Sequence, residues 1–399
     1  MAMIELPRFF RRESRPTPAE TAAAPPFASV VEALPDPLML VSGDSGQAPR
    51  LVMANAAARA LLNMPRTGGP LAASLRRPEV LEAVETALWG RIEENVVYES
   101  GERIWRVTAT PLAQVTTPGA ERTILLLMRD ETDARRNARM RADFLANASH
   151  ELRTPLASIA GFIETLQGPA KNDAPARARF LLIMAGQAAR MIRLVDDLLA
   201  LSRIELDEHL PPTGDYDLAQ AATEVAEALA PLAASRKVTV KLEKHGPGPA
   251  QGSRDQLIQV AQNLIENGLK YAPEGGAVRI RVLGPGPLDA LMASDPASPR
   301  TTANGGGRLA LITPELEPGQ LYVGLEVADN GVGMERTSLP RLTERFYRVE
   351  GQKSVERGGT GLGLAIVKHI VNRHRGALTV ESAPGLGSVF TVALPAAQA

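Results

Sequence analysis

Residues 144–156 read FLANASHELRTPL, and this stretch decides how the middle of the chain is built. It opens a run in which apolar residues recur at alternating steps of four and three, the spacing of one face of a long helix. His150 directly follows a position of that apolar seam, so helix geometry turns its imidazole away from the seam. Pro155 has no N–H, and we expect the helix to bend beside His150.

Two such seams predict a helical hairpin over residues 131–206. The first seam comprises Leu145, Ser149, Leu152, Leu156, Ile159, Ile163 and Leu166, and the second comprises Phe180, Met184, Gln187, Met191, Leu194, Leu198 and Leu201. The segment between them, residues 167–175, is rich in Gly and Pro and is predicted to be a turn. Because one hairpin cannot cover both seams, we expect two copies to form a four-helix bundle, and hence a homodimer.

The composition of the 399 residues narrows the classes of function. Lys plus Arg number 44 and Asp plus Glu 45, so the net charge is −1 and lacks the basic excess expected of a nucleic-acid binder. There is no cysteine, which excludes disulfides, thiolate metal sites and iron–sulfur clusters. No run of 18 apolar residues appears. We therefore expect a soluble, cytoplasmic protein without a nucleic-acid partner.

The segments before the hairpin predict a tail and a first domain. Residues 1–26 are rich in Pro and Ala and are expected to be disordered. Phe9 and Phe10 beside three arginines leave open a peripheral contact with a membrane complex at the inner face of the plasma membrane. Residues 27–130 predict an antiparallel sheet with small helices. Their order, with MANAAA at residues 53–58, resembles a PAS sensory domain, and a dimerisation module that senses nothing stays the alternative.

From residue 215 to residue 396 the pattern alternates between helix and strand. Helices are expected over residues 217–235, 253–270 and 361–374, and strands over residues 237–243, 277–283, 321–329, 377–382 and 388–395. This alternation predicts an α/β domain whose sheet is covered by helices. Residues 284–319 are rich in Gly and Pro and are expected to be a loop insertion without structure of its own.

Several strings in this part resemble one family in a fixed order. Residues 144–156 match the H-box of HisKA-type sensor histidine kinases nearly letter for letter. NLIENGLKY at residues 263–271 resembles the N-box, DNGVG at 329–333 the first glycine box, ERFYR at 344–348 the F-box, and RGGTGLGL at 357–364 the second glycine box. The joint match implies the GHKL (Bergerat) ATP-binding sandwich within a multidomain α+β protein. No GxxxxGK[ST] or GxGxxG string occurs, so P-loop and Rossmann interpretations fail.

The chemistry of these residues fits that resemblance. An imidazole on a rigid helix is a good phosphoryl acceptor, so His150 is the expected acceptor, and Glu151 is expected to orient the ring and take its proton. Asn263, Asn267 and Lys270 share a helix face, where amide oxygens suit Mg²⁺ and the ammonium suits a phosphate. Asp329 is expected to accept a hydrogen bond from the adenine amino group. For the two asparagines alone, a pair of solvated amides stays the alternative.

The resemblance implies binding of ATP and Mg²⁺ by a defined set of residues. They are Asn263, Asn267, Lys270, Tyr271, Asp329, Gly331, Gly333, Arg345, Arg348, Gly359, Thr360, Gly361, Leu362 and Gly363, with Asn267 on the metal ion. Gly268 stands where the family has Ala, at a cost of about 1 kcal/mol in a helix. Thr154, one turn after His150, resembles the family's phosphatase residue, and a hydroxyl satisfied by a backbone carbonyl is the alternative.

We therefore expect a two-component sensor histidine kinase. It would phosphorylate itself on His150, pass the phosphoryl group to an aspartate of a response regulator of the OmpR/PhoB type, and also dephosphorylate that regulator. FLANASHELRTPLASI at residues 144–159 and LVDDLLALSRIE at residues 194–205 most resemble the phosphate-regulon sensor kinases, which suggests phosphate-starvation signalling. A phosphatase-dominant or non-catalytic signalling scaffold is the alternative. An ATP-hydrolysing GHKL machine would lack the acceptor histidine.

Overall fold

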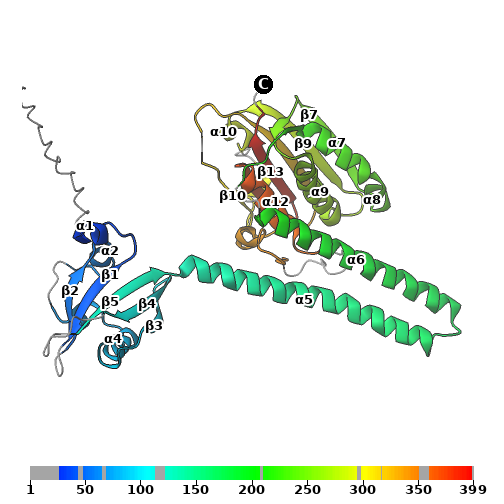
Figure 1. Cartoon of the computed structure of the whole chain (residues 1–399). Helices are drawn as coiled ribbons and strands as arrows, with labels where there is room; N and C mark the ends of the chain where they lie inside the picture. Colours follow the sequence, from blue (N-terminus) through cyan, green and yellow to red (C-terminus); the bar gives the residue numbers. More distant parts are fainter. Residues whose placement is uncertain are drawn as a thin grey trace, which may run out of the picture. The chain divides into compact units, whose positions relative to one another are not determined.

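A computed structural model of the chain describes residues 27–43, 48–64, 69–112, 122–206, 210–293, 298–315, 317–349 and 359–397 (Figure 1). The chain divides into two units, Met1–Ala142 and Asp143–Ala399. The boundary falls inside a long helix, because the helix that leaves the first domain continues directly into the predicted hairpin. The tail predicted for residues 1–26 lies outside the described residues.

The first unit is built on a five-stranded antiparallel sheet with the strand order β2-β1-β5-β4-β3. Its elements are α1 (Phe27–Glu32), β1 (Leu38–Gly43), β2 (Arg50–Ala54), α2 (Ala56–Leu61), α3 (Leu71–Ser74), α4 (Pro78–Gly90), β3 (Glu94–Ser100), β4 (Arg103–Pro111) and β5 (Arg122–Asp130). Along β4 and β5 every second side chain is buried, as in a sheet with one covered face. The predicted antiparallel sheet with small helices is confirmed.

Asn55, within the MANAAA string, joins α2 to the sheet. Its side chain is fully buried, and its Oδ1 accepts hydrogen bonds from the backbone N–H of Leu38 at 3.0 Å and of Ala58 at 2.9 Å. Its Nδ2 donates to the carbonyl oxygen of Asp36 at 2.9 Å. One buried amide therefore caps the helix and satisfies the start of β1 at the same time.

The predicted helical hairpin consists of α5 (Thr132–Gln167) and α6 (Ala174–Leu206). An ion pair between Glu151 and Arg190 at 2.7 Å, and the stacked rings of Phe162 and Phe180, join the two helices. The second seam faces inward, with Leu194 and Leu201 buried. Several large apolar side chains of the hairpin stay exposed: Leu145, Leu156, Ile163, Leu182, Ile192 and Leu199. The hairpin alone therefore leaves an apolar surface uncovered.

The rest of the second unit is a six-stranded sheet with the order β10-β12-β13-β11-β9-β7, on which helices are packed (Figure 1). Its elements are β6 (Asp215–Asp217), α7 (Leu218–Ala228), α8 (Ala230–Ser235), β7 (Thr239–His245), β8 (Pro249–Gln251), α9 (Arg254–Tyr271), β9 (Ala277–Gly286), β11 (Tyr322–Asp329), η1 (Arg336–Arg341), α12 (Gly363–Arg373), β12 (Ala377–Ala383) and β13 (Gly387–Pro395). β7 and β9 run parallel, and the other neighbouring pairs are antiparallel. The predicted α/β domain is confirmed.

The insertion at residues 284–319 differs from the prediction, because it has structure of its own. It contains α10 (Leu288–Leu291), α11 (Pro299–Thr302) and β10 (Gly307–Ile312), and β10 pairs with β12 at the edge of the sheet. Leu288 packs into a small cluster with Tyr322, Ala377 and Ala393. The Gly and Pro residues on either side concealed a short strand whose stability comes from pairing with β12, a contact distant in sequence.

We predict that Asn55→Ala destabilises the first unit by roughly 2–4 kcal/mol, because it removes a helix cap and leaves buried backbone N–H groups without acceptors. Urea unfolding followed by tryptophan fluorescence measures this effect, since both tryptophans of the chain, Trp89 and Trp105, lie in this unit. Asn95→Ala is the matched control, because Asn95 bonds Thr108 at an exposed position. Equal unfolding midpoints for the two variants would contradict the role of Asn55.

Candidate functional site

A cavity of about 530 Å³ lies in the second unit, among α9, the end of β11 and the loop before α12. The predicted residues that line it are Asn263, Asn267, Lys270, Tyr271, Asp329, Gly333, Arg348, Gly359, Thr360, Gly361 and Gly363. The volume is in the range of small-molecule sites. Most of the predicted binding residues therefore meet around one cavity, although they come from strings almost a hundred residues apart.

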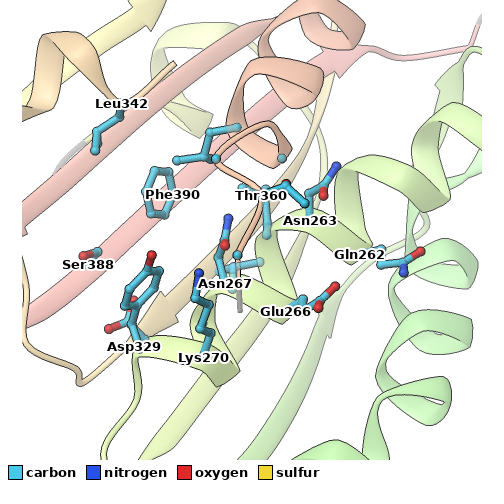
Figure 2. Close-up of a pocket in the computed structure, with 18 of the residues that line it drawn as sticks. Gln262, Asn263, Glu266, Asn267, Lys270, Asp329, Leu342, Thr360, Ser388 and Phe390 are labelled. Carbon is cyan, nitrogen blue, oxygen red and sulfur yellow. The ribbon is translucent and has the colours of Figure 1, made fainter. Parts of the chain in front are cut away.

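Helix α9 forms one wall of the cavity. Its apolar residues pack into the core, and its polar face carries Asn263, Asn267 and Lys270, which project into the cavity (Figure 2). The Nδ2 of Asn263 is buried and has no hydrogen-bond partner among the described residues. A buried donor without an acceptor costs about 1–3 kcal/mol, so this amide is suited to a ligand that supplies the acceptor.

Gly268, predicted to weaken α9, is explained by its surroundings. The residue is buried, and a Cβ atom at this position would lie 3.1 Å from Cγ1 of Val278 on β9. The absence of a side chain lets the helix approach the sheet closely. The loss of helix propensity is thus offset by tight packing of the wall that carries the two asparagines.

Asp329 ends β11 and marks one end of the cavity (Figure 2). Its side chain is only 7% exposed, and Oδ1 accepts a hydrogen bond from the backbone N–H of Gly331 at 2.8 Å. Burial raises the pKa of Asp329 to about 6, against the opposing effects of backbone N–H groups of Gly331 and Ser388 and the charge of Arg300. The carboxylate is therefore oriented by the backbone and is poorly hydrated, so it is suited to accept a hydrogen bond from a ligand.

Cationic groups gather around the loop before α12. Arg348 donates a hydrogen bond to the carbonyl oxygen of Gly359, and Nζ of Lys270 lies directly against Gly359. The loop leads into the N-terminus of α12, whose first residue is Gly363. An ammonium, a guanidinium and helix N–H groups together favour an anion such as a phosphate group.

Three of the predicted binding residues do not line the cavity: Gly331, Arg345 and Leu362. Arg345 does not line the cavity, because its guanidinium forms an ion pair with Glu205 of α6 at 2.5 Å and lies over the ring of Phe144. Leu362 is fully buried and belongs to the apolar core. Gly331 acts through its backbone, by orienting Asp329. Arg357 and Gly358 of the second glycine box lie outside the described residues.

Helix α6 contributes cavity residues that sequence reasoning missed. Arg193, Asp196 and Asp197 line the cavity, and the hydroxyl of Thr360 donates to Oδ2 of Asp197 at 2.7 Å. Burial, with the nearby charge of Glu266, raises the pKa of Asp197. In the sequence, Asp196 and Asp197 lie between two positions of the apolar seam, Leu194 and Leu198. No local spacing links them to a cavity whose other residues come mainly from segments far along the chain.

His150 is exposed on α5, as is its neighbour Ser149 of the predicted seam. The orientation of the ring away from the bundle core stays a prediction. The neighbouring Glu151 is held by Arg190 of α6 at 2.7 Å. The hydroxyl of Thr154 donates to the backbone carbonyl of His150 at 3.2 Å, the alternative considered for this residue. His150 does not line the cavity. The exposed imidazole and the cavity are therefore separate features of the same unit.

Two features are absent from the described residues. Within the ranges that the structure describes, no group of three or more His, Asp or Glu residues could hold a metal ion. A divalent ion would therefore need further ligands from water or from the bound molecule. Across the described part of the chain, no helix is long and apolar enough to span a bilayer.

Comparison with known proteins agrees with this geometry. Residues 140–207 match the His Kinase A (phospho-acceptor) domain, and residues 252–398 match the histidine kinase-, DNA gyrase B- and HSP90-like ATPase family. The first match contains His150, all of α6 and α5 from residue 140 onward. The second contains α9, Asp329 and the glycine loop, so each match falls on one of the two features described above.

Named relatives cover a similar part of the chain. The phosphate regulon sensor protein PhoR of Pseudomonas aeruginosa is 36% identical over 274 residues, which are 69% of this chain and 54% of that protein. The sensor-like histidine kinase SenX3 of Mycobacterium tuberculosis is 30% identical over 284 residues, 71% of this chain and 61% of that protein. The chain spans about half the length of the curated relatives it matches.

A solved structure of the Acinetobacter baumannii histidine kinase AdeS is also similar, with a TM-score of 0.42 and 22% identity over 62% of this chain and 98% of that one. The two domain matches stand in the same order as the H-box and the later boxes, and they enclose the exposed histidine and the polar cavity. From these matches, the chain belongs to the sensor histidine kinase family.

Proposed function

We propose that the protein binds ATP with Mg²⁺, transfers the γ-phosphoryl group to His150, and passes it to an aspartate of a separate response regulator. The observation that carries this proposal is the cavity, in which Asn263, Asn267, Lys270 and Asp329 meet in the unit that also exposes His150. A binding cavity and an accessible acceptor in one unit are the two parts that phosphoryl transfer requires.

The purine ring would lie at the Asp329 end of the cavity. The carboxylate is buried and held by backbone N–H groups, so its remaining acceptor capacity is directed and poorly hydrated. The exocyclic amino group of adenine can donate a hydrogen bond to this carboxylate. Guanine has a carbonyl oxygen at the same ring position, and two acceptors would then face each other. This arrangement supports ATP over GTP.

The triphosphate would lie toward Lys270, Arg348 and the loop at Gly359. Charge neutralisation and positioning are the main requirements of phosphoryl transfer, and these residues supply both. Mg²⁺ fits the amide oxygen of Asn267, because the ion accepts few protein ligands and completes its shell with water and phosphate oxygens. When bound, the ion would neutralise phosphate charge.

In the transfer step a ring nitrogen of His150 forms a bond to the γ-phosphorus while the bond to the ADP oxygen breaks. The ring proton passes to a base, and Glu151 is the adjacent carboxylate. Since His150 does not line the cavity, the ATP-binding part must approach α5. The contacts of Thr360 with Asp197 and of Arg345 with Glu205 would have to yield for this approach.

We infer that the active form is a homodimer. The exposed apolar side chains of the hairpin, among them Leu145, Leu156 and Ile192, form a surface that a second hairpin could cover as a four-helix bundle. A bundle would bury side chains that are each more than half exposed in one chain. Burying a large apolar side chain fully stabilises the assembly by about 1.5–3 kcal/mol.

The partner and the signal are inferred from the relatives. A response regulator of the OmpR/PhoB type and a signal related to phosphate supply follow from the resemblance to the phosphate regulon sensor protein PhoR. Residues 27–130 would act as a PAS-like sensory domain. The protein would work in the cytoplasm or at the inner face of the plasma membrane.

Phosphatase activity toward the regulator is a second candidate function. Thr154 lies one helical turn after His150 on the exposed side of α5. Its hydroxyl donates a long hydrogen bond, 3.2 Å, to the backbone carbonyl of His150 and could exchange this contact for one with a water molecule. A hydroxyl beside the acceptor histidine would then orient that water toward a phosphorylated aspartate.

We predict that His150→Gln abolishes labelling by γ-labelled ATP with Mg²⁺, because the glutamine amide is not a nucleophile for phosphorus. Wild-type label should be acid-labile and alkali-stable, as a phosphoramidate is. His245→Gln is the matched control, since His245 is exposed on β7 away from the hairpin, and it should label normally. Normal labelling of His150→Gln would refute the acceptor assignment.

We predict that ATP binding weakens by about tenfold per pH unit below pH 6, because protonation of Asp329 removes the ionised acceptor. Because the pKa of Asp329 is raised to about 6, the affinity for ATP falls as the pH drops through 6. The affinity is highest well above pH 6, where the carboxyl group is fully ionised. Calorimetric titration of the protein with ATP across this range gives the dissociation constants. Asp329→Asn should bind weakly at every pH, and tight binding by that variant would contradict the role of the carboxylate.

We predict that Thr154→Ala keeps histidine labelling but slows dephosphorylation of a regulator about tenfold, because the hydroxyl that orients the water is lost. The assay follows decay of the phosphorylated regulator in the presence of the kinase and ADP. Thr165→Ala is the matched control, since Thr165 makes the same hydroxyl-to-backbone bond on α5, to Gly161 at 2.8 Å. Equal decay rates with the two variants would reject the phosphatase role.

A further inference from the structure

We propose that Arg300, from the insertion between β9 and β11, is a positioning residue for the purine end of the ATP site. Arg300 does not line the cavity. It lies behind Asp329 and acts on the nucleotide through that residue. This inference rests on the proposed binding of ATP and extends it to a segment that the sequence predicted to be unstructured.

Arg300 bridges the two backbone segments that hold the Asp329 carboxylate. Its Nη2 donates to the carbonyl oxygen of Asp329 at 3.2 Å, and its Nε donates to the carbonyl oxygen of Leu386 at 3.1 Å. Leu386 lies in the turn between β12 and β13, immediately before Gly387 and Ser388. The backbone N–H of Ser388 is one of the donors to the carboxylate, so the guanidinium joins the acceptor to the turn that orients it.

These two segments are packed too closely to tolerate a shift. Gly387 has φ +74°, and a side chain there would overlap the carbonyl oxygen of Asp329. The backbone N–H of Gly385 donates to the carbonyl oxygen of Val332 at 2.8 Å, which closes the other side of the contact. A bridge across such a contact fixes the direction of the carboxylate rather than merely adding stability.

Contacts with the rest of the domain hold the segment of the insertion that carries Arg300. Ser298, just before α11, is buried and its hydroxyl donates to Glu381 of β12 at 3.4 Å. The N–H of Arg336 donates to the carbonyl oxygen of Gly305 at 3.0 Å, and β10 continues the sheet beyond β12. The insertion therefore spans from one edge of the sheet to the back of the nucleotide site and is anchored at several points on the way.

The charge of Arg300 matters as well as its hydrogen bonds. Besides Asp329 itself, the charged side chains that line the cavity are Lys270 and Glu266 on α9, Arg236, Arg348, and Arg193, Asp196 and Asp197 on α6. Among the described residues, Arg300 is the charged group whose field lowers the pKa of Asp329 against the effect of burial. Its positive charge thus favours the ionised carboxylate that an amino group requires.

The test is calorimetric titration of the full chain with ATP at roughly pH 5.5 to 8.5. The ratio of the dissociation constants of variant and wild type at each pH cancels protonation of the triphosphate. For Arg300→Gln we expect weaker binding, with a loss about threefold larger at the lowest pH than at the highest, equivalent to an upward shift of about half a unit in the midpoint. For Arg300→Lys we expect a ratio that stays constant with pH, because the charge is kept and only the bridge is lost.

The control is Arg375→Gln, which breaks an ion pair with Glu317 of the same insertion at 3.2 Å and shares no partner with Arg300. It should bind ATP as the wild type does at every pH. Wild-type binding by Arg300→Gln, a loss that does not change with pH, or the same pH-dependent loss in Arg375→Gln would each overturn the proposal. If the wild-type protein binds no ATP at any pH, the proposed function fails instead.

Discussion

The packing of α9 on the sheet is the constraint on which the nucleotide site depends. Leu257, Leu264 and Leu269 of this helix are buried in the core, so its opposite, polar face must border the cavity. Gly268 permits the close approach to Val278. The packing of this apolar helix face therefore positions two amides and an ammonium group on the wall of the cavity.

The cavity is polarised by burial at one end and by cations at the other. Asp329 is a poorly hydrated acceptor at the end of β11, whereas Lys270 and Arg348 gather beside Gly359. A molecule with an amino-bearing ring and a chain of phosphates has the complementary distribution. The hydrogen bond of Thr360 with Asp197 connects the cationic end of the cavity to helix α6 of the hairpin.

Much of the site could be predicted because its chemistry lies in contiguous strings. Asn263, Asn267 and Lys270 fall on one helix, and the glycines before α12 need only local backbone freedom. Arg345 could not be assigned from its string, since its partners Glu205 and Phe144 belong to the hairpin. Leu362 lies in a glycine-rich string, yet its side chain is buried by residues that the string does not contain.

The sequence by itself determined the helical hairpin, the α/β domain and the strings whose residues line the cavity, because each depends on residue type and short-range periodicity. Only the tertiary structure decided that Asp197 reaches the cavity, that β10 joins the sheet beside β12, and that Arg300 lies behind Asp329. These contacts join residues 29 to 163 positions apart, and no local pattern records which distant side chains the packed core brings together.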